Sequence, residues 1–255
     1  MESKWVQVAG CSLHYRVPCE QLAGHGLAIV MVHGLVVSSR YMIPAAERLA
    51  SSFRVYLPEL PGFGKSEKPD HYQDLDQMAD TLVAWMTAIG LPQAVFLGNS
   101  LGCQIIARLA VRHPERVQSA ILVSPTMDAQ ARTAHQEIGR WLLNAFSEPI
   151  SLYPLVLRDY LDIGFRRFVA TFRYGLQDRI EVYLPQMDLP TLVVRGSRDT
   201  VVPQRWAEEV TRLLPRGKLV VLEKAAHDVN YNMPDELAAT IRAFLAEQSL
   251  LHFSL

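Results

Sequence analysis

The stretch Gly98-Asn99-Ser100-Leu101-Gly102 constrains the fold of this chain more than any other. It lies between an apolar run at 94–97, which indicates a buried strand, and the segment 101–113, whose apolar residues fall on one face of a helix. A turn this tight strains the serine backbone, and the flanking glycines remove side chains that would collide. The serine hydroxyl is then lifted above the sheet, beside the first N–H groups of the helix. The pattern therefore predicts a candidate nucleophile at position 100.

Apolar runs alternate with helical patterns along most of the chain. The expected strands are 5–8, 13–17, 28–32, 54–57, 94–97, 117–123, 191–195 and 219–222. The expected helices of the same region are 41–50, 75–89, 101–113, 204–214 and 235–247. The first two strands flank Ala9-Gly10 as a hairpin, whereas the later ones are mostly separated by helices. This alternation predicts an α/β fold with a mostly parallel, eight-stranded sheet and helices on both faces.

The alternation stops between residues 126 and 189, where helical patterns are broken by proline and glycine. Three or four helices are expected in this segment, and no strand. We therefore predict a core domain formed by residues 1–125 and 190–255, and a helical cap, 126–189, inserted so that it covers one edge of the sheet.

Composition limits the class of protein. The 255 residues are 49% hydrophobic and carry a formal net charge of −1, which favours a large core and gives no reason to expect nucleic acid or a membrane as partner. The first residues lack the apolar segment of a signal peptide, and the three cysteines show no metal-ligand spacing. We expect a cytoplasmic protein that acts on a small molecule, as a monomer or homodimer.

A serine hydroxyl is a poor nucleophile near neutral pH, so it needs a base and a third group that orients the base. His227 follows the last expected strand, and Asp199 follows the strand before it. Because parallel strands end at one edge of a sheet, both residues should lie on the same side as Ser100. Asp128, close after the strand 117–123, is the alternative acid.

A serine, an aspartate and a histidine in this order, each after a strand, resemble the α/β-hydrolase fold family. The resemblance covers nearly the whole chain and includes His33-Gly34, 61–66, 98–102, 113–117, 196–199 and His227. It implies an acyl-enzyme mechanism with Ser100, His227 and Asp199 as catalytic triad. It also implies an oxyanion hole formed by the backbone N–H groups of Leu35 and Leu101, and no metal or organic cofactor.

Two positions differ from the commoner pattern of the family: Asn99 replaces histidine and Glu59 replaces aspartate. The first is familiar from the carbon–carbon bond hydrolases of the family, whereas the second should affect only loop bonding. The loop 35–39 and the segment 228–232 lack, respectively, the Gly-Pro-Gly continuation and the tryptophans that those enzymes often show.

Asn99 favours the carbon–carbon hydrolases, but the two missing features outweigh it and favour a carboxylic ester with a short to medium acyl chain as substrate. We expect an apolar pocket lined by Trp141, Leu142 and Phe146, and poor acceptance of branching next to the carbonyl because the Leu35 side chain would crowd it. Two alternatives remain open. One is a carbon–carbon hydrolase of a meta-cleavage-type diketone, and the other is a ligand-sensing receptor with little turnover.

Overall fold

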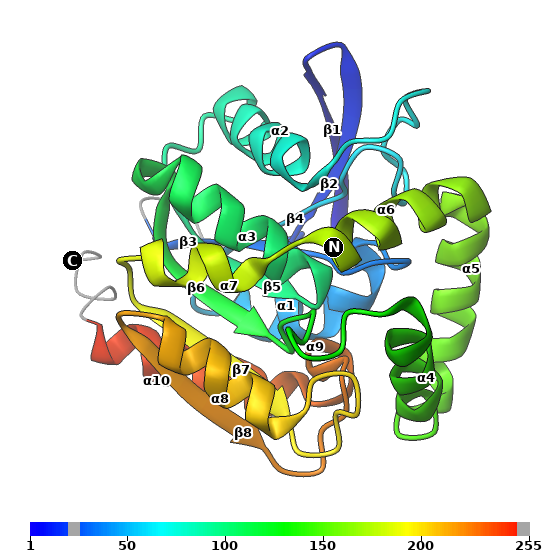
Figure 1. The fold of residues 1–255 in the computed structure, drawn as a ribbon. Helices are drawn as coiled ribbons and strands as arrows, with labels where there is room; N and C mark the ends of the chain where they lie inside the picture. Colours follow the sequence, from blue (N-terminus) through cyan, green and yellow to red (C-terminus); the bar gives the residue numbers. More distant parts are fainter. Residues whose placement is uncertain (20–25, 249–255) are drawn as a thin grey trace.

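A computed structural model describes residues 1–19 and 26–248 of the chain (Figure 1). Its eight strands form one sheet in the order β1-β2-β4-β3-β5-β6-β7-β8. They are β1 (Glu2–Val8), β2 (Cys11–Val17), β3 (Ala28–Val32), β4 (Arg54–Pro58), β5 (Ala94–Asn99), β6 (Val117–Val123), β7 (Thr191–Gly196) and β8 (Gly217–Leu222). β2 pairs antiparallel with β1 and with β4, and all other neighbours are parallel. The predicted fold class is confirmed.

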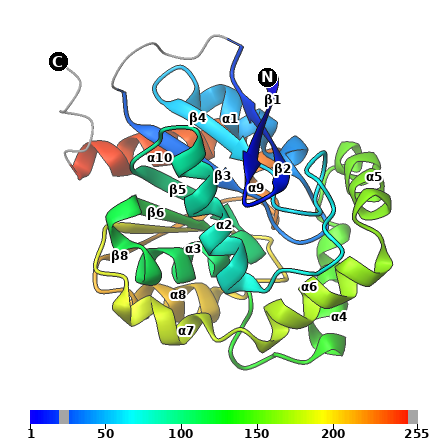
Figure 2. The same cartoon turned by 90° about the horizontal axis from the view of Figure 1, so that it is seen from above.

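Helices cover both faces of the sheet (Figure 2). One face packs against α2 (Leu75–Ala88), α3 (Leu101–Arg112) and α8 (Gln204–Leu213), and the other against α1 (Ile43–Leu49) and α10 (Pro234–Glu247). Successive side chains of a strand enter opposite cores: Phe96 of β5 belongs to the first, and its neighbours Val95 and Leu97 to the second. Because both faces are buried, the central strands appear in the sequence as unbroken apolar runs.

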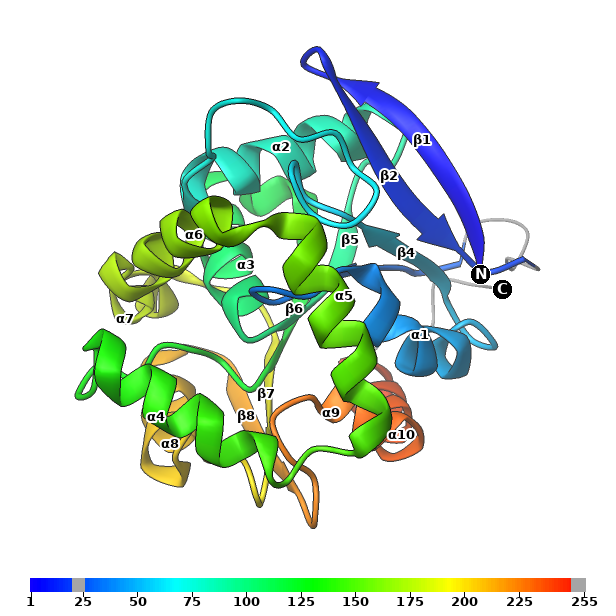
Figure 3. The same cartoon turned by 90° about the vertical axis from the view of Figure 1, so that its right-hand side faces the viewer.

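The chain between β6 and β7 is helical. It contains α4 (Ala134–Ala145), α5 (Tyr153–Ile163), α6 (Phe165–Gln177) and α7 (Ile180–Tyr183), and residues 126–189, all of which are described, form no strand. Figures 1 and 3 show α4, α5 and α6 beside the end of the sheet at which β5 and β6 end. Asp159 of α5 accepts a hydrogen bond from the Ser38 N–H at 2.8 Å and pairs with Arg40, which ties this helical segment to the loop after β3.

Two local features differ from the sequence prediction. The helix expected at 41–50 begins as a 3₁₀ turn, Ser39–Met42, and continues as α1, with Pro44 in its first turn where a missing N–H costs little. A short helix, α9 (Val229–Asn232), was not expected, because four residues are too few for a periodic pattern. Among the described residues, no helix is both long and apolar enough to cross a membrane.

Candidate active site

Ser100 occupies the turn between β5 and α3, where its backbone has a φ of 55°. This left-handed conformation is strained for a residue with a side chain. A Cβ atom at Gly98 would lie 2.6 Å from the backbone of Gly102, and one at Gly102 would lie 2.4 Å from the carbonyl oxygen of Val32. Neither position has room for a side chain, so the glycines allow the tight turn that the sequence predicts.

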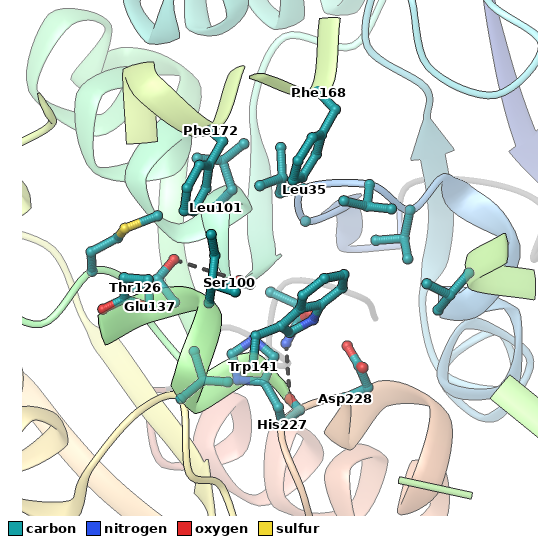
Figure 4. Close-up of a pocket in the computed structure, with 18 residues that line it drawn as sticks. Leu35, Ser100, Leu101, Thr126, Glu137, Trp141, Phe168, Phe172, His227 and Asp228 are labelled. Atoms are coloured by element: carbon teal, nitrogen blue, oxygen red, sulfur yellow. Dashed lines mark hydrogen bonds between the residues drawn. The ribbon is translucent and has the colours of Figure 1, made fainter. Parts of the chain in front are cut away.

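The hydroxyl group of Ser100 lies in a pocket that Thr126 and His227 also line (Figure 4). Its Oγ is 3.5 Å from Thr126 Oγ1. Among the described residues, Thr126 is the one hydrogen-bond partner of the Ser100 side chain. A bond from Ser100 to His227 is not formed in this geometry. Hydrogen bonds between catalytic groups are often long in a free enzyme and shorten when substrate binds.

His227 and Asp199 form a buried pair after β8 and β7. Nδ1 of His227 lies 3.0 Å from Asp199 Oδ2, while Asp199 Oδ1 accepts the N–H groups of Val201 and Val202 at 2.8 and 2.9 Å. Burial alone would raise the pKa of Asp199, but the charge of His227 and these hydrogen bonds lower it. Burial alone would lower the pKa of His227, but the Asp199 carboxylate is the strongest of the acidic groups that together raise it to about 9. The pair therefore fixes the orientation and tautomer of the imidazole ring.

Asp128, the alternative acid, has other partners. Arg140 lies 2.9 Å from its Oδ2, and Arg205 donates to Oδ1 at 2.9 Å. These arginines lower the pKa of Asp128 against the raising effect of burial. Of the two candidate acids, Asp199 is the one that contacts His227 in the described structure.

A hydrogen-bonded chain through Tyr41 joins the three loops around Ser100. The Gly34 N–H donates to the Tyr41 hydroxyl at 3.0 Å, and that hydroxyl donates to Asn99 Oδ1 at 2.8 Å. Asn99 Nδ2 donates in turn to the carbonyl oxygens of Val123 and His227 at 3.3 and 3.2 Å. Both ends of the Asn99 side chain are therefore used to hold the loop after β3, the serine turn and the histidine loop together.

The loop after β3 places Leu35 in the pocket, next to Gly34. His33 is fully buried and accepts a hydrogen bond from the Leu60 N–H at 3.2 Å, which ties the loop after β3 to the loop after β4. Leu101 also lines the pocket, and as the first residue of α3 its N–H has no partner within the helix. Both residues predicted for the oxyanion hole therefore lie at the same cavity as Ser100.

The wall of the pocket is mainly apolar, with Phe168 and Phe172 of α6 and Trp141 of α4 among its residues (Figure 4). Trp141 lies where the sequence places it, but the prediction is wrong for Leu142 and Phe146. They are 58% and 89% exposed and do not line the pocket. The reason is helix geometry: one residue beyond Trp141 turns by about 100° away from the pocket, and Phe146 follows the last residue of α4.

Two carboxyl groups face the same pocket, Glu137 of α4 and Asp228 beside His227. Burial raises the pKa of Glu137 to about 7, although the nearby Arg140 charge acts in the opposite direction. Burial and the carboxylate of Glu148 raise the pKa of Asp228 to about 7 as well. Within the described chain, neither lysine nor arginine lines this pocket.

Sequence reasoning missed Tyr41, Thr126, Glu137 and Asp228 as members of the site. For Asp228 the sequence offered one weak indication, namely that it directly follows the predicted base His227. For Tyr41 and Glu137 the sequence offered no indication of a place in the site, because a tyrosine near a helix start and a glutamate within a polar helical pattern are ordinary surface residues in most chains.

Comparison with known proteins identifies the family. A family profile described as alpha/beta hydrolase fold matches residues 28–152, and a second, described as TAP-like protein, matches residues 170–251. Together with the eight-stranded sheet and similar solved structures, these matches show that the chain belongs to the α/β-hydrolase fold family.

The relatives include hydrolases of two kinds. The chain is 25% identical to 2-hydroxymuconate semialdehyde hydrolase of Pseudomonas putida, over 90% of each chain. It is 28% identical to pimeloyl-[acyl-carrier protein] methyl ester esterase of Nitrosomonas europaea, over 88% of this chain and 97% of that one. The crystal structure of a membrane phospholipase A, described as a bacterial virulence factor, superposes with a TM-score of 0.77 at 26% identity, covering 96% of this chain and 86% of the other. These relatives support hydrolase activity in general.

Proposed function

We propose that the protein is a serine hydrolase that cleaves an uncharged carboxylic ester of short to medium acyl chain. Ser100 attacks the ester carbonyl, and His227 accepts the serine proton and returns it to the leaving alcohol. Asp199 orients the imidazole ring and stabilises its charged form. The acyl group stays on Ser100 until water, activated by the same histidine, releases it.

The backbone N–H groups of Leu35 and Leu101 stabilise the negative charge that develops on the carbonyl oxygen. Both residues line the pocket beside Ser100, and the loop of Leu35 is held in place by the Tyr41 hydroxyl through Gly34. A donor fixed in advance is effective because it need not reorganise as the charge forms; losing one such donor typically costs about 100- to 1,000-fold in rate.

The charge of the pocket is the observation that selects an uncharged ester. Its wall is apolar, its ionisable groups besides His227 are the carboxyls of Glu137 and Asp228, and no lysine or arginine of the described chain lines it. An anionic substrate would be buried next to these carboxyl groups without a lysine or arginine as partner, which is unfavourable. A neutral ester has no such cost.

The alternative is the cleavage of a carbon–carbon bond in a meta-cleavage-type diketone, the reaction class suggested by Asn99 and by one of the relatives. Two observations disfavour it. The side chain of Asn99 hydrogen-bonds Tyr41, Val123 and His227. These bonds explain the asparagine by a structural role, without any role in carbon–carbon cleavage. The dienol-type substrate of this reaction carries a carboxylate, and no lysine or arginine of the described chain lines the pocket to pair with it.

The deciding experiment compares kcat/KM for p-nitrophenyl butyrate with that for a vinylogous 1,5-diketone carrying a carboxylate. The ester is expected to be the better substrate, and an anionic monoester of the same length should be cleaved more slowly than the neutral one. A diketone value a hundredfold above that of the ester, equivalent to about 2.7 kcal/mol of transition-state binding, would reverse the choice. A single stoichiometric release of product without further turnover would instead indicate a ligand-sensing protein.

The pH dependence tests the role of His227. The base acts in its neutral form, so kcat/KM must rise as the histidine loses its proton. The usual histidine pKa would place this rise at roughly 6–7, but the Asp199 carboxylate and other acids, acting against burial, raise the pKa of His227 to about 9. We therefore expect kcat/KM for p-nitrophenyl butyrate to keep rising above pH 7. Asp228→Asn should move the midpoint to lower pH, because Asp228 is one of the groups that raise this pKa. A profile that is flat from pH 5 to 9 would contradict His227 as the base.

A further inference from the structure

Glu137 brings a buried carboxyl group into the pocket of Ser100, and its side chain has no hydrogen-bond partner among the described residues. Its side chain is only 5% exposed, and Oε1, which is enclosed, accepts no hydrogen bond from the described residues. Buried carboxyl groups are normally hydrogen-bonded, because an unpaired polar group in an apolar environment is costly. The proposed mechanism does not use this group.

Arg140 forms an ion pair with Glu137 but donates no hydrogen bond to it. Nη1 of Arg140 lies 3.6 Å from Glu137 Oε1, which is within ion-pair range but beyond hydrogen-bonding distance, and neither atom has a hydrogen-bond partner among the described residues. Nη2 of the same arginine is 2.9 Å from Asp128. Asp128 also holds Arg205. Arg140 is thus oriented by Asp128, and its charge lowers the pKa of Glu137 less than burial raises it.

The surroundings of Glu137 in the pocket limit what its partner can be. Ile138 and Trp141, from the same helix as Glu137, and Met127 are among the apolar residues that line this pocket. An alkyl segment of a substrate can pack against these walls, and a polar substituent can then reach the carboxyl group.

We propose that Glu137 is a substrate-binding residue that hydrogen-bonds a hydroxyl group of the substrate, so that the enzyme selects uncharged hydroxy-esters. The inference rests on the proposed ester hydrolysis and narrows its substrate class. Because the Glu137 pKa is about 7, both forms of the carboxyl group are present near neutral pH. A hydroxyl group suits both, since it accepts from the neutral acid and donates to the carboxylate. A keto oxygen would suit only the neutral form, and a carboxylate would be repelled by the ionised form and by Asp228.

The test uses pairs of esters that differ only by a hydroxyl in place of a methyl group. In propyl butyrate and 2-hydroxyethyl butyrate the difference is on the alcohol side, and in methyl 3-methylbutyrate and methyl 3-hydroxybutyrate it is on the acyl side. The wild-type protein should prefer the hydroxyl member of at least one pair by about tenfold or more in kcat/KM, because a site built around a polar group rejects the analogue that leaves it unpaired.

Two substitutions identify the residue responsible. Glu137→Leu should lower the hydroxyl-to-methyl ratio of kcat/KM about tenfold, since leucine offers no hydrogen bond. Glu137→Gln, the matched control, should keep most of the preference, because an amide of the same shape both donates and accepts. Fluorophosphonate labelling of Ser100 and the melting temperature show whether each variant is folded and carries a reactive serine.

The outcomes separate this inference from the proposed function. Turnover of the alkyl esters by the wild-type protein, without preference for either hydroxyl member, overturns the inference and leaves ester hydrolysis standing, whether or not the leucine variant folds. A wild-type preference that Glu137→Leu leaves unchanged overturns it as well. If the substitutions only lower the melting temperature, Glu137 supports α4 and does not bind substrate. Absence of turnover on every ester overturns both.

Discussion

Replacement of Ser100 by alanine should lower kcat on p-nitrophenyl butyrate by about 10⁶-fold. The variant lacks the proposed nucleophile, so His227 has no serine proton to accept. The rate that remains should come from the oxyanion hole and substrate binding, which typically supply about 10³- to 10⁴-fold over water. Steady-state kinetics measure the loss, and intact-protein mass spectrometry should show one fluorophosphonate group on the wild-type protein, at Ser100, and none on the variant.

Two matched controls accompany this variant. Ser147→Ala removes an exposed hydroxyl outside the pocket and should change neither labelling nor rate. Thr126→Val removes the hydroxyl whose oxygen lies 3.5 Å from Ser100 Oγ, and it should leave Ser100 open to labelling. A probe bound to Thr126 in the wild-type protein, or an unchanged rate in Ser100→Ala, would show that the mechanism is wrong.

Asp199→Asn should lower kcat by about 10⁴-fold while the protein remains folded. The amide can donate a hydrogen bond to His227 Nδ1, which favours the tautomer that carries its proton on Nε2 and cannot accept the proton of Ser100. The change also removes the carboxylate that does most to raise the His227 pKa against burial. We therefore expect the midpoint of the pH–rate profile to move to lower pH together with the loss of rate, whereas a misfolded variant would show only the loss.

The control for this variant is Asp128→Asn. Asp128 is buried and paired with Arg140 and Arg205, so its substitution should lower the melting temperature and have a much smaller effect on kcat. If Asp128→Asn shows the large loss of rate and Asp199→Asn does not, the acid of the triad has been assigned to the wrong residue.

Much of the fold could be predicted from the sequence because the information is local. Each central strand is buried on both faces, so a run such as Ala28–Val32 is apolar throughout, and helices between such runs impose parallel pairing. The helical character of 126–189 was visible because proline and glycine interrupt its patterns without a strand between them. The short helix α9 could not be predicted, because four residues are too few to show a helical periodicity.

The candidate residues at the strand ends could also be predicted from the sequence. Parallel strands end at one edge, so residues that follow β5, β7 and β8 must lie on the same side of the sheet, however far apart they are in the chain. The structure brings His227 and Asp199 within hydrogen-bonding distance, as this rule predicts. The sequence alone left Asp128 open as the acid, and its two arginine partners, 12 and 77 residues away, became visible only after folding.

The class of fold, the serine turn and the candidates for the base and the acid could be predicted before the structure was known, because glycine spacing and strand order are properties of the linear chain. The lining of the pocket, in contrast, depends on how the helices pack against the sheet. Glu137 and Trp141 face Ser100 while Leu142 and Phe146 do not, since that choice depends on how α4 is rotated over the sheet. Periodicity reports that a helix has a buried side, but which residues meet across a cavity is set by packing between elements that are distant in the sequence.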